Sequence, residues 1–431
     1  MAAARPDPAV RAEAAVRAVA GVRPKAPALN TLVILLIAAH LVLLGGRYYA
    51  TGTFVAGDSA WQFATLRSLY MQGSLDLADE ARYFYEDRSP VSGHRRLPGV
   101  PDPDPRTGMV TTMYPVGGAL IRLPAYAAAD LLARAAVVLG IRHDRAGYRG
   151  LYQLLPAAFS ALAGIAGLLF LARVISQGHE GTALIATVTV WLASPIVYYL
   201  TIEPLMTHAL SIGLACALVA LGLRSRERPA TWSLLAQGAL CGLLTITRYQ
   251  DAVFLLFPVV LLRTDRLRGA ALVAAGALPF VLLQLYVNDA WYGTPWTTGY
   301  ARMIDPAWLR PDLIRHLFHP VQGAFTTHPI HLLGILGAVL LLKCDAPVAG
   351  GLLVIAAVQI YAISVLIPTT PGASFGNRTV TSLAPLFVLG WVTLTARMPR
   401  LHAAGAALVA VNAVVAALYC LRIITDPMVL P

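Results

Sequence analysis

Charged residues are scarce in this sequence. Asp, Glu, Lys and Arg make up 13% of its 431 residues, whereas about a quarter is usual for a soluble domain. Hydrophobic residues make up 57%, and the mean hydropathy is +0.65. Apolar runs close to the roughly 20 residues that span a bilayer recur along most of the chain. The sequence therefore predicts an all-α integral membrane protein.

Several motifs of soluble chemistry are also missing. The sequence has no Walker A loop, no GxGxxG after a strand and no HExxH, which argues against soluble nucleotide chemistry. Its four cysteines lie in or beside apolar runs without a CxxC or Cys/His cluster, so neither a disulfide framework nor a zinc site is expected. The net charge is +11. Because the basic residues gather at the ends of apolar segments without interleaved aromatics, they favour a membrane over a nucleic acid as partner.

The first apolar run, at about 31–46, follows a basic tail over residues 1–30. We interpret the tail as cytoplasmic and the run as an uncleaved signal anchor. Ten further apolar runs fall at about 151–174, 182–200, 206–223, 231–247, 249–264, 268–287, 328–343, 347–367, 379–396 and 403–421.

The segment 113–140 decides the topology. It contains Arg122, Asp130 and Arg134, so a simple lipid-facing span would be costly. If it is a re-entrant or surface-lying hairpin, the short basic loops after residues 223, 262 and 396 all face the cytoplasm, as the positive-inside rule requires. We expect about eleven spans, within a range of roughly 10 to 13, with the N-terminus inside. The long loops 47–112 and 288–327 then lie outside.

The first external loop opens with a candidate catalytic acid. Asp58 follows Gly57 and precedes apolar residues at helical spacing, which predicts an amphipathic helix on the membrane surface. Asp58 is then either the N-cap of that helix or a carboxylate whose partial desolvation suits it to general-base catalysis. Asp79 is a further acid in the same loop.

Polar groups interrupt the later apolar runs at their external ends. They include Glu203, His208, Arg248 with Asp251, Asn288 and Arg378. Such groups at membrane depth usually face a bundle interior or a water-filled cavity. The alternatives are that Arg248 forms a structural pair with Asp251, that His208 is a satisfied interior histidine, and that Arg378 is an interfacial anchor.

In chain order, these motifs resemble those of the GT-C superfamily of membrane glycosyltransferases, which includes the protein O-mannosyltransferases and the lipid A aminoarabinose transferases. The chain looks most like bacterial members, and the resemblance covers about residues 30–420. The stretches that carry it are Gly57-Asp58, Gly73-Ser74-Leu75-Asp76-Leu77, Thr107-Gly108, Tyr114-Pro115-Val116-Gly117, Glu203-Pro204-Leu205-Met206-Thr207-His208, Thr247-Arg248-Tyr249-Gln250-Asp251, Tyr292-Gly293-Thr294-Pro295, Gly299-Tyr300 and Phe375-Gly376-Asn377-Arg378.

The resemblance implies a GT-C-type glycosyltransferase domain over residues 31–431, with amphipathic surface helices in its first external loop, in a bacterial inner membrane. It implies transfer of a sugar from a polyprenyl-phosphate donor to a hydroxyl of a glycan, lipid or protein, with inversion. Asp58 takes the general-base role of the family's first-loop aspartate. Arg248 and Arg378 are the candidates to stabilise the lipid phosphate. The residues expected to shape the substrate pocket are Glu203, His208, Asp79, Tyr114, Asn288 and Tyr300.

Two departures from the family's pattern bear on cofactors. Ser59 stands where many members have a second acid, and Tyr114-Pro115-Val116 stands where some have His-Pro-Pro. The sequence assigns no metal ligands, and it leaves open whether a divalent metal ion serves as a cofactor. The alternative function is a transporter or lipid flippase, which typically has inverted repeats; the sequence shows no convincing repeat. A third is a non-catalytic subunit of a cell-envelope complex.

Overall fold

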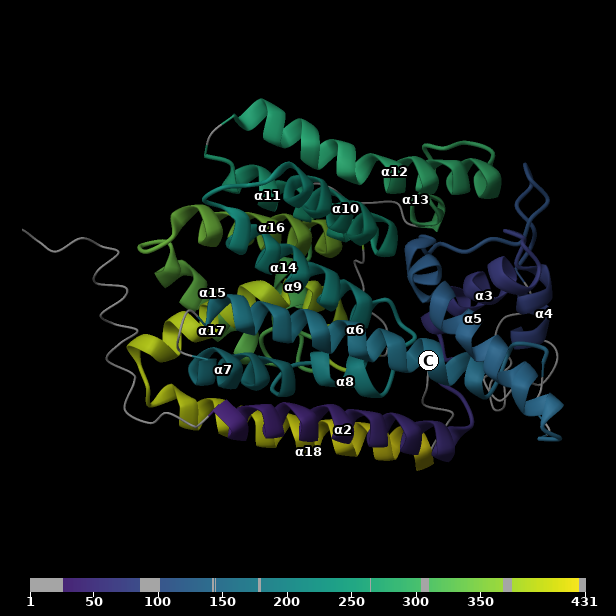
Figure 1. Ribbon diagram of the computed structural model, residues 1–431, viewed down its shortest axis with the longest axis horizontal. Coiled ribbons are helices and arrows are strands. Elements are labelled where there is room, and N and C mark those ends of the chain that lie inside the picture. The colour runs from purple at the N-terminus through teal and green to yellow at the C-terminus, as the bar shows by residue number, and fades with distance from the viewer. Residues whose placement is uncertain are drawn as a thin grey trace, which may run out of the picture.

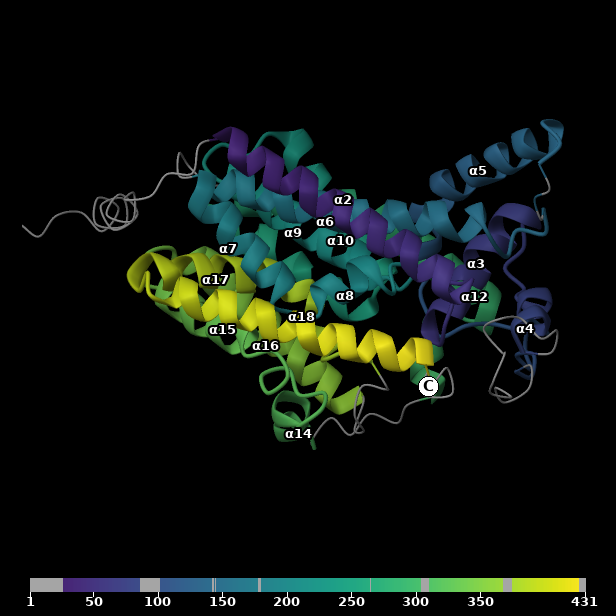
Figure 2. The same ribbon diagram turned by 90° about the horizontal axis from the view of Figure 1, so that it is seen from below.

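The computed structural model describes residues 26–85, 101–141, 143, 145–176, 180–263, 265–303, 310–366 and 374–425. Throughout these ranges the regular secondary structure is helical, without a strand. Figures 1 and 2 show most helices running along the long axis of the molecule. Within the described ranges, seven helical segments are long and apolar enough to cross a membrane. The chain is therefore a multi-pass α-helical membrane protein, as its composition predicted.

The seven long segments are α2 (Ala26–Thr51), α6 (Leu151–Ile175), α9 (His208–Ser225), α12 (Arg266–Tyr292), α16 (Ala346–Leu366), η2 with α17 (Arg378–Leu383 and Ala384–Arg397) and α18 (Leu401–Thr425). Shorter apolar helices lie among them: α7 (Glu180–Leu192), α10 (Thr231–Thr247), η1 with α11 (Tyr249–Leu255 and Leu256–Leu261) and α15 (Ile330–Leu341). A short helix, α8 (Ile196–Thr201), follows α7 after a break at Ser194 and Pro195. The predicted tail 1–30 lies outside the described residues, apart from the start of α2.

Three helices gather at one end of the bundle. They are α3 (Asp58–Met71), α4 (Ala78–Tyr85) and α5 (Gly117–Val138), and both views place them at the same end of the molecule, where α12 also ends (Figures 1 and 2). The prediction of a hairpin over residues 113–140 is wrong, because α5 is one continuous helix with Pro124 inside it. Its charges have internal partners: Arg122 binds backbone carbonyls, and Asp130 accepts from Arg134 and Tyr152.

Helix α3 begins at the predicted residue but is not a one-sided surface helix. Its buried residues run nearly consecutively from Ser59 to Leu66, so they point to every side of the helix. Helices α4 and α5 pack against it and cover the side that was expected to face water. The helix that presents Asp58 is therefore held inside the protein.

Close helix pairs depend on glycine. A Cβ added to Gly390 of α17 would lie 1.8 Å from the Gly334 carbonyl oxygen of α15. A Cβ on Gly276 of α12 would lie 2.1 Å from the Leu235 carbonyl oxygen of α10. The helices α6 and α9 meet in the same way at Gly167 and Gly213. Small residues allow close backbone approach in membrane bundles, where van der Waals packing replaces the hydrophobic effect.

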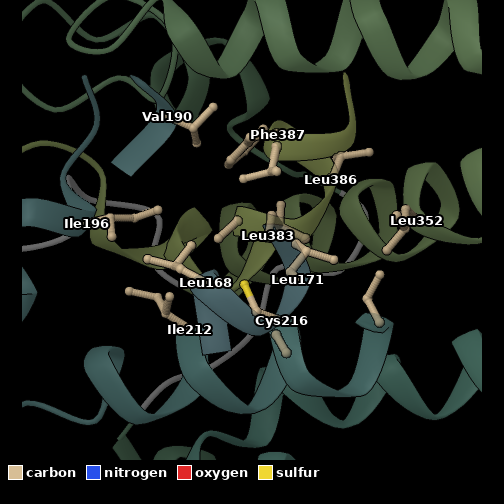
Figure 3. Close-up of a cluster of buried hydrophobic side chains, with 14 of the residues drawn as sticks. Leu168, Leu171, Val190, Ile196, Ile212, Cys216, Leu352, Leu383, Leu386 and Phe387 are labelled. Atoms are coloured by element: carbon tan, nitrogen blue, oxygen red, sulfur yellow. The ribbon is translucent and has the colours of Figure 1, made fainter. Parts of the chain in front are cut away.

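The main core lies between these helix pairs. Leu168 and Leu171 of α6 meet Ile212 and Cys216 of α9, and Phe387 of α17 lies in the same cluster (Figure 3). Of the four cysteines, Cys216 and Cys241 are buried as small hydrophobic residues, whereas Cys344 is exposed and Cys420 is half-buried.

The end of the bundle opposite α3 to α5 is basic. Four connections meet there, joined by the ion pairs Arg226–Asp345 and Arg263–Glu227 and by a hydrogen bond from Arg397 to the Leu340 carbonyl. Three of these connections, those with Arg226, Arg263 and Arg397, are the loops that the sequence assigned to one side of the membrane. The helices α9 and α17 lead from this end to the polar residues His208 and Arg378 at the other.

Candidate functional site

A cavity of about 390 Å³ lies at the end of the bundle where α3 and α5 meet the long helices. Its wall comes from α3, the segment before α5, the turns at the start of α9 and the end of α10, α13 (Gly299–Met303), α16 and η2. Six of the nine residues predicted for the site line it: Asp58, Tyr114, His208, Arg248, Tyr300 and Arg378. These residues come from parts of the chain that are up to 320 positions apart.

Asp58 is the first residue of α3 and faces Arg378. Gly57, with φ of 51°, is the N-cap, so Asp58 does not hold the N-cap position. Instead, Arg378 Nη2 lies 2.7 Å from Asp58 Oδ2, and the two side chains are 20% and 33% exposed. The Asp58 carboxylate therefore lies in the cavity, and its negative charge is held by a guanidinium group rather than by the helix backbone.

Arg248 stands at the junction of α10 and η1. Its backbone is extended there, with φ of −152°, so the helix is interrupted at this residue. The carboxylate of nearby Asp251 accepts hydrogen bonds from Ser211, Ser382 and Gln359. Arg248 Nη1, by contrast, is buried without a hydrogen-bond partner. Asp251 thus fixes the turn, while Arg248 keeps an N–H group free at the cavity.

The turns that carry the two arginines are braced together. Gln250 Nε2 donates to the Thr379 carbonyl at 2.8 Å. Asn377 Oδ1 accepts from the Thr379 backbone N–H, and its amide donates to the carbonyl of His316 in α14 (Leu313–Phe318). The turns that carry Arg248 and Arg378 are therefore joined by hydrogen bonds from the Gln250 and Asn377 side chains to the backbone.

Three tyrosines form an aromatic part of the wall. The Tyr300 ring stands edge-on to Tyr114 and to Tyr249. Burial raises the pKa of Tyr114, as do the charge of Asp58 and its hydrogen bond. Burial likewise raises the pKa of Tyr300, to about 12. Both hydroxyls remain protonated at neutral pH, and that of Tyr114 donates to Asp58.

His208 lines the cavity at the start of α9. Its Nδ1 lies 3.1 Å from Thr381 Oγ1, which donates in turn to the Arg378 carbonyl. His208 therefore borders the cavity and also supports the Arg378 turn. It is at once a residue of the pocket and an interior histidine with a hydrogen-bond partner.

Three predicted site residues do not line the cavity. Asn288 lies in α12 behind the wall, where it accepts from Tyr249 and Gln284. Glu203 accepts from Tyr198, and burial raises its pKa. Asp79 is 58% exposed and pairs with Arg82. The prediction for Asp79 needs correction, since the order of acids along a loop does not tell which of them turns inward.

The sequence reasoning missed several lining residues, among them Gln62, Thr207 and Thr247. Gln62 follows Asp58 by four positions, a spacing that places two residues on one helix face, so a signal for it was present. Thr207 and Thr247 directly precede the predicted site residues His208 and Arg248, but residue type did not single them out, because threonine in or beside a helix commonly bonds the local backbone.

No protein-family model matches the chain, and a search of curated proteins gives no match. Within the described ranges, no group of three or more His, Cys, Asp or Glu side chains is arranged to hold a metal ion. The potential metal ligands that border the cavity are Asp58 and His208.

Proposed function

We propose that this protein transfers a sugar from a polyprenyl-phosphate donor to a hydroxyl acceptor, with inversion at the anomeric carbon. One observation carries the proposal: a carboxylate and two guanidinium groups share a cavity at one end of an apolar helical bundle. The carboxylate can accept the proton of the acceptor hydroxyl, and the guanidinium groups can bind the leaving phosphate.

The reaction assigns a task to each charge. The acceptor oxygen attacks the anomeric carbon, its proton passes to Asp58, and the bond from the anomeric carbon to the phosphate oxygen breaks. Help from a general base of this kind is worth about 10²- to 10⁴-fold in rate. The released phosphate gains negative charge, which Arg248 and Arg378 stabilise as preorganised donors.

The ion pair between Asp58 and Arg378 fits this sequence of events. In the cavity, Arg378 Nη2 contacts the Asp58 carboxylate at 2.7 Å. The donor phosphate competes for the same guanidinium group, so donor binding frees Asp58 for the acceptor.

We infer the membrane topology from the difference between the basic end of the bundle and the end that holds the cavity. If the four shorter apolar segments also cross the membrane, they bring the seven long helices to eleven spans. With the basic end in the cytoplasm, the N-terminus is inside and the cavity opens on the extracytoplasmic face of a bacterial inner membrane. A donor carried by the lipid reaches such a cavity without a nucleotide.

The test is a transfer assay with the purified chain, a polyprenyl-phosphate sugar and a hydroxyl acceptor. Asp58→Asn keeps an acceptor oxygen for Arg378 but removes the base, so we expect product formation to fall by about 10² or more. Asp79→Asn, which changes an exposed acid outside the cavity, serves as the matched control.

Full activity in folded Asp58→Asn would exclude this mechanism. A transporter or flippase would move the lipid-linked sugar without forming product. Donor-dependent product formation by the purified chain therefore distinguishes a glycosyltransferase from a transporter or flippase.

A further inference from the structure

Three polar atoms on the cavity wall are buried without a hydrogen-bond partner. They are Gln62 Oε1, Thr247 Oγ1 and Arg248 Nη1. The side chains of Gln62 and Thr247 are only 6% and 1% exposed. Most buried polar atoms in native proteins have a partner, and each exception needs an explanation. Three exceptions on one cavity indicate a ligand that supplies the missing partners.

Thr247 differs from the other threonine of the same helix end. Thr245 Oγ1 donates to the Cys241 carbonyl at 2.9 Å, four residues back, which is the usual way for a helical threonine to be satisfied. Thr247 lines the cavity and makes no such bond. Its hydroxyl therefore lacks a protein partner, at a position where a valine would fill the same volume.

The three atoms define the chemistry of the ligand. The amide oxygen of Gln62 accepts a hydrogen bond, the hydroxyl of Thr247 can donate or accept, and the guanidinium group of Arg248 donates to an anion. A group with hydroxyls joined to a phosphate supplies all three. Thr247 and Arg248 are neighbours in the chain, so a phosphate at Arg248 brings its attached sugar near Thr247. Gln62 lies one helical turn beyond Asp58.

We propose that Gln62 and Thr247 form the subsite that recognises hydroxyl groups of the transferred sugar, an inference that rests on the proposed function. Gln62 Oε1 accepts from one sugar hydroxyl, and Thr247 Oγ1 bonds another. A site built in this way discriminates against a sugar that lacks either hydroxyl, because the buried protein atom is then left unpaired. These two side chains, rather than the charged residues, determine which sugar is accepted.

The experiment measures binding without turnover. The purified full chain in lipid nanodiscs is titrated with farnesyl-phosphate-linked hexoses and pentoses in the absence of an acceptor. Thr247→Val and Gln62→Leu remove the hydrogen-bonding atoms with little change in volume, and Thr245→Val is the matched control. We expect the Kd for the best ligand to rise about five- to tenfold in each cavity variant, and to stay unchanged in the control.

The stability of the ligand-free protein provides a second readout. Because Gln62 Oε1 and Thr247 Oγ1 have no protein partner, their removal should leave the melting temperature unchanged or raise it. A deoxy sugar that lacks the hydroxyl read by Gln62 should bind the unsubstituted chain and Gln62→Leu equally.

The outcomes separate the subsite from the reaction. Unchanged Kd values in both cavity variants, or a lower melting temperature without ligand, would overturn the subsite. Failure of every panel member to bind the unsubstituted chain would overturn the subsite and the donor class together. Normal, variant-sensitive binding without product formation would support the subsite and refute only the transfer reaction.

Discussion

Replacement of Arg248 should weaken donor binding because a contact with the phosphate is lost, and it should leave the binding of the apolar tail unchanged. The cavity wall carries two guanidinium groups and one carboxylate, from Arg248, Arg378 and Asp58. Arg378 already holds Asp58 at 2.7 Å. Arg248 is therefore the cation whose N–H is free for a ligand, and in Arg248→Gln one guanidinium group must serve both Asp58 and the donor phosphate.

The magnitude follows from the contact that is lost. A hydrogen bond to a charged group contributes about 1.5 to 3 kcal/mol. Since about 1.4 kcal/mol is a tenfold change, the Kd for a phosphate-bearing lipid should rise about 10- to 150-fold. Arg248→Lys keeps the charge beside Asp251 but loses the planar fork that matches phosphate, so we expect the smaller end of that range.

The assay compares farnesyl phosphate with farnesol, which has the same tail without the charge. The ratio of the two Kd values isolates the phosphate contribution from any change in the apolar part of the site. Arg82→Gln, an exposed arginine that pairs with Asp79, is the control. If Arg248→Gln leaves this ratio at the unsubstituted value, Arg248 does not bind the phosphate and the reasoning fails.

Two further predictions concern the scaffold and its orientation. Gly390→Ala places a Cβ 1.8 Å from a backbone oxygen, so α15 and α17 must separate at a cost of about 1 to 3 kcal/mol or more. The melting temperature of this variant in detergent should therefore fall. In the control Gly350→Ala the nearest atom to the added Cβ lies at 3.8 Å, so this variant should melt at the same temperature as the unsubstituted chain. Equal melting of the two variants would contradict the packing argument. In a Cys420→Ala background, the exposed Cys344 at the basic end should react with a membrane-impermeant maleimide only after spheroplasts are opened; labelling of intact spheroplasts would invert the topology.

The sequence predicted the helices well because lipid leaves the chain few options. Each predicted apolar run has a helix in the structure, since every backbone group within a bilayer must be satisfied locally. The ends of the runs were less predictable. Helix α2 extends to Thr51 and α12 to Tyr292, so Asn288 belongs to a helix rather than to a loop.

The segment 113–140 shows where local reasoning fails. Its charges argued against a lipid-facing span and the positive-inside rule favoured a hairpin, yet α5 is one continuous helix whose charges have tertiary partners. Arg122 donates to the Pro204 and Met206 carbonyls, which lie more than 80 residues away. The unpartnered atoms of Gln62 and Thr247 could not be predicted either, because the absence of a partner is a property of the folded structure.

Irregular backbone and the cavity occur together for a physical reason. The helices break at Arg248 and between residues 201 and 208, and 3-10 turns begin at Tyr249 and Arg378. Each break frees backbone groups, and polar side chains bind them: Arg122 binds carbonyls of the 203–207 turn, Gln250 the Thr379 carbonyl, and Asn377 the Thr379 N–H. At membrane depth such backbone is tolerated only where protein or a cavity surrounds it. The interruptions that turn Arg248 and Arg378 inward thus depend on these bracing side chains, which position the charges without touching a substrate.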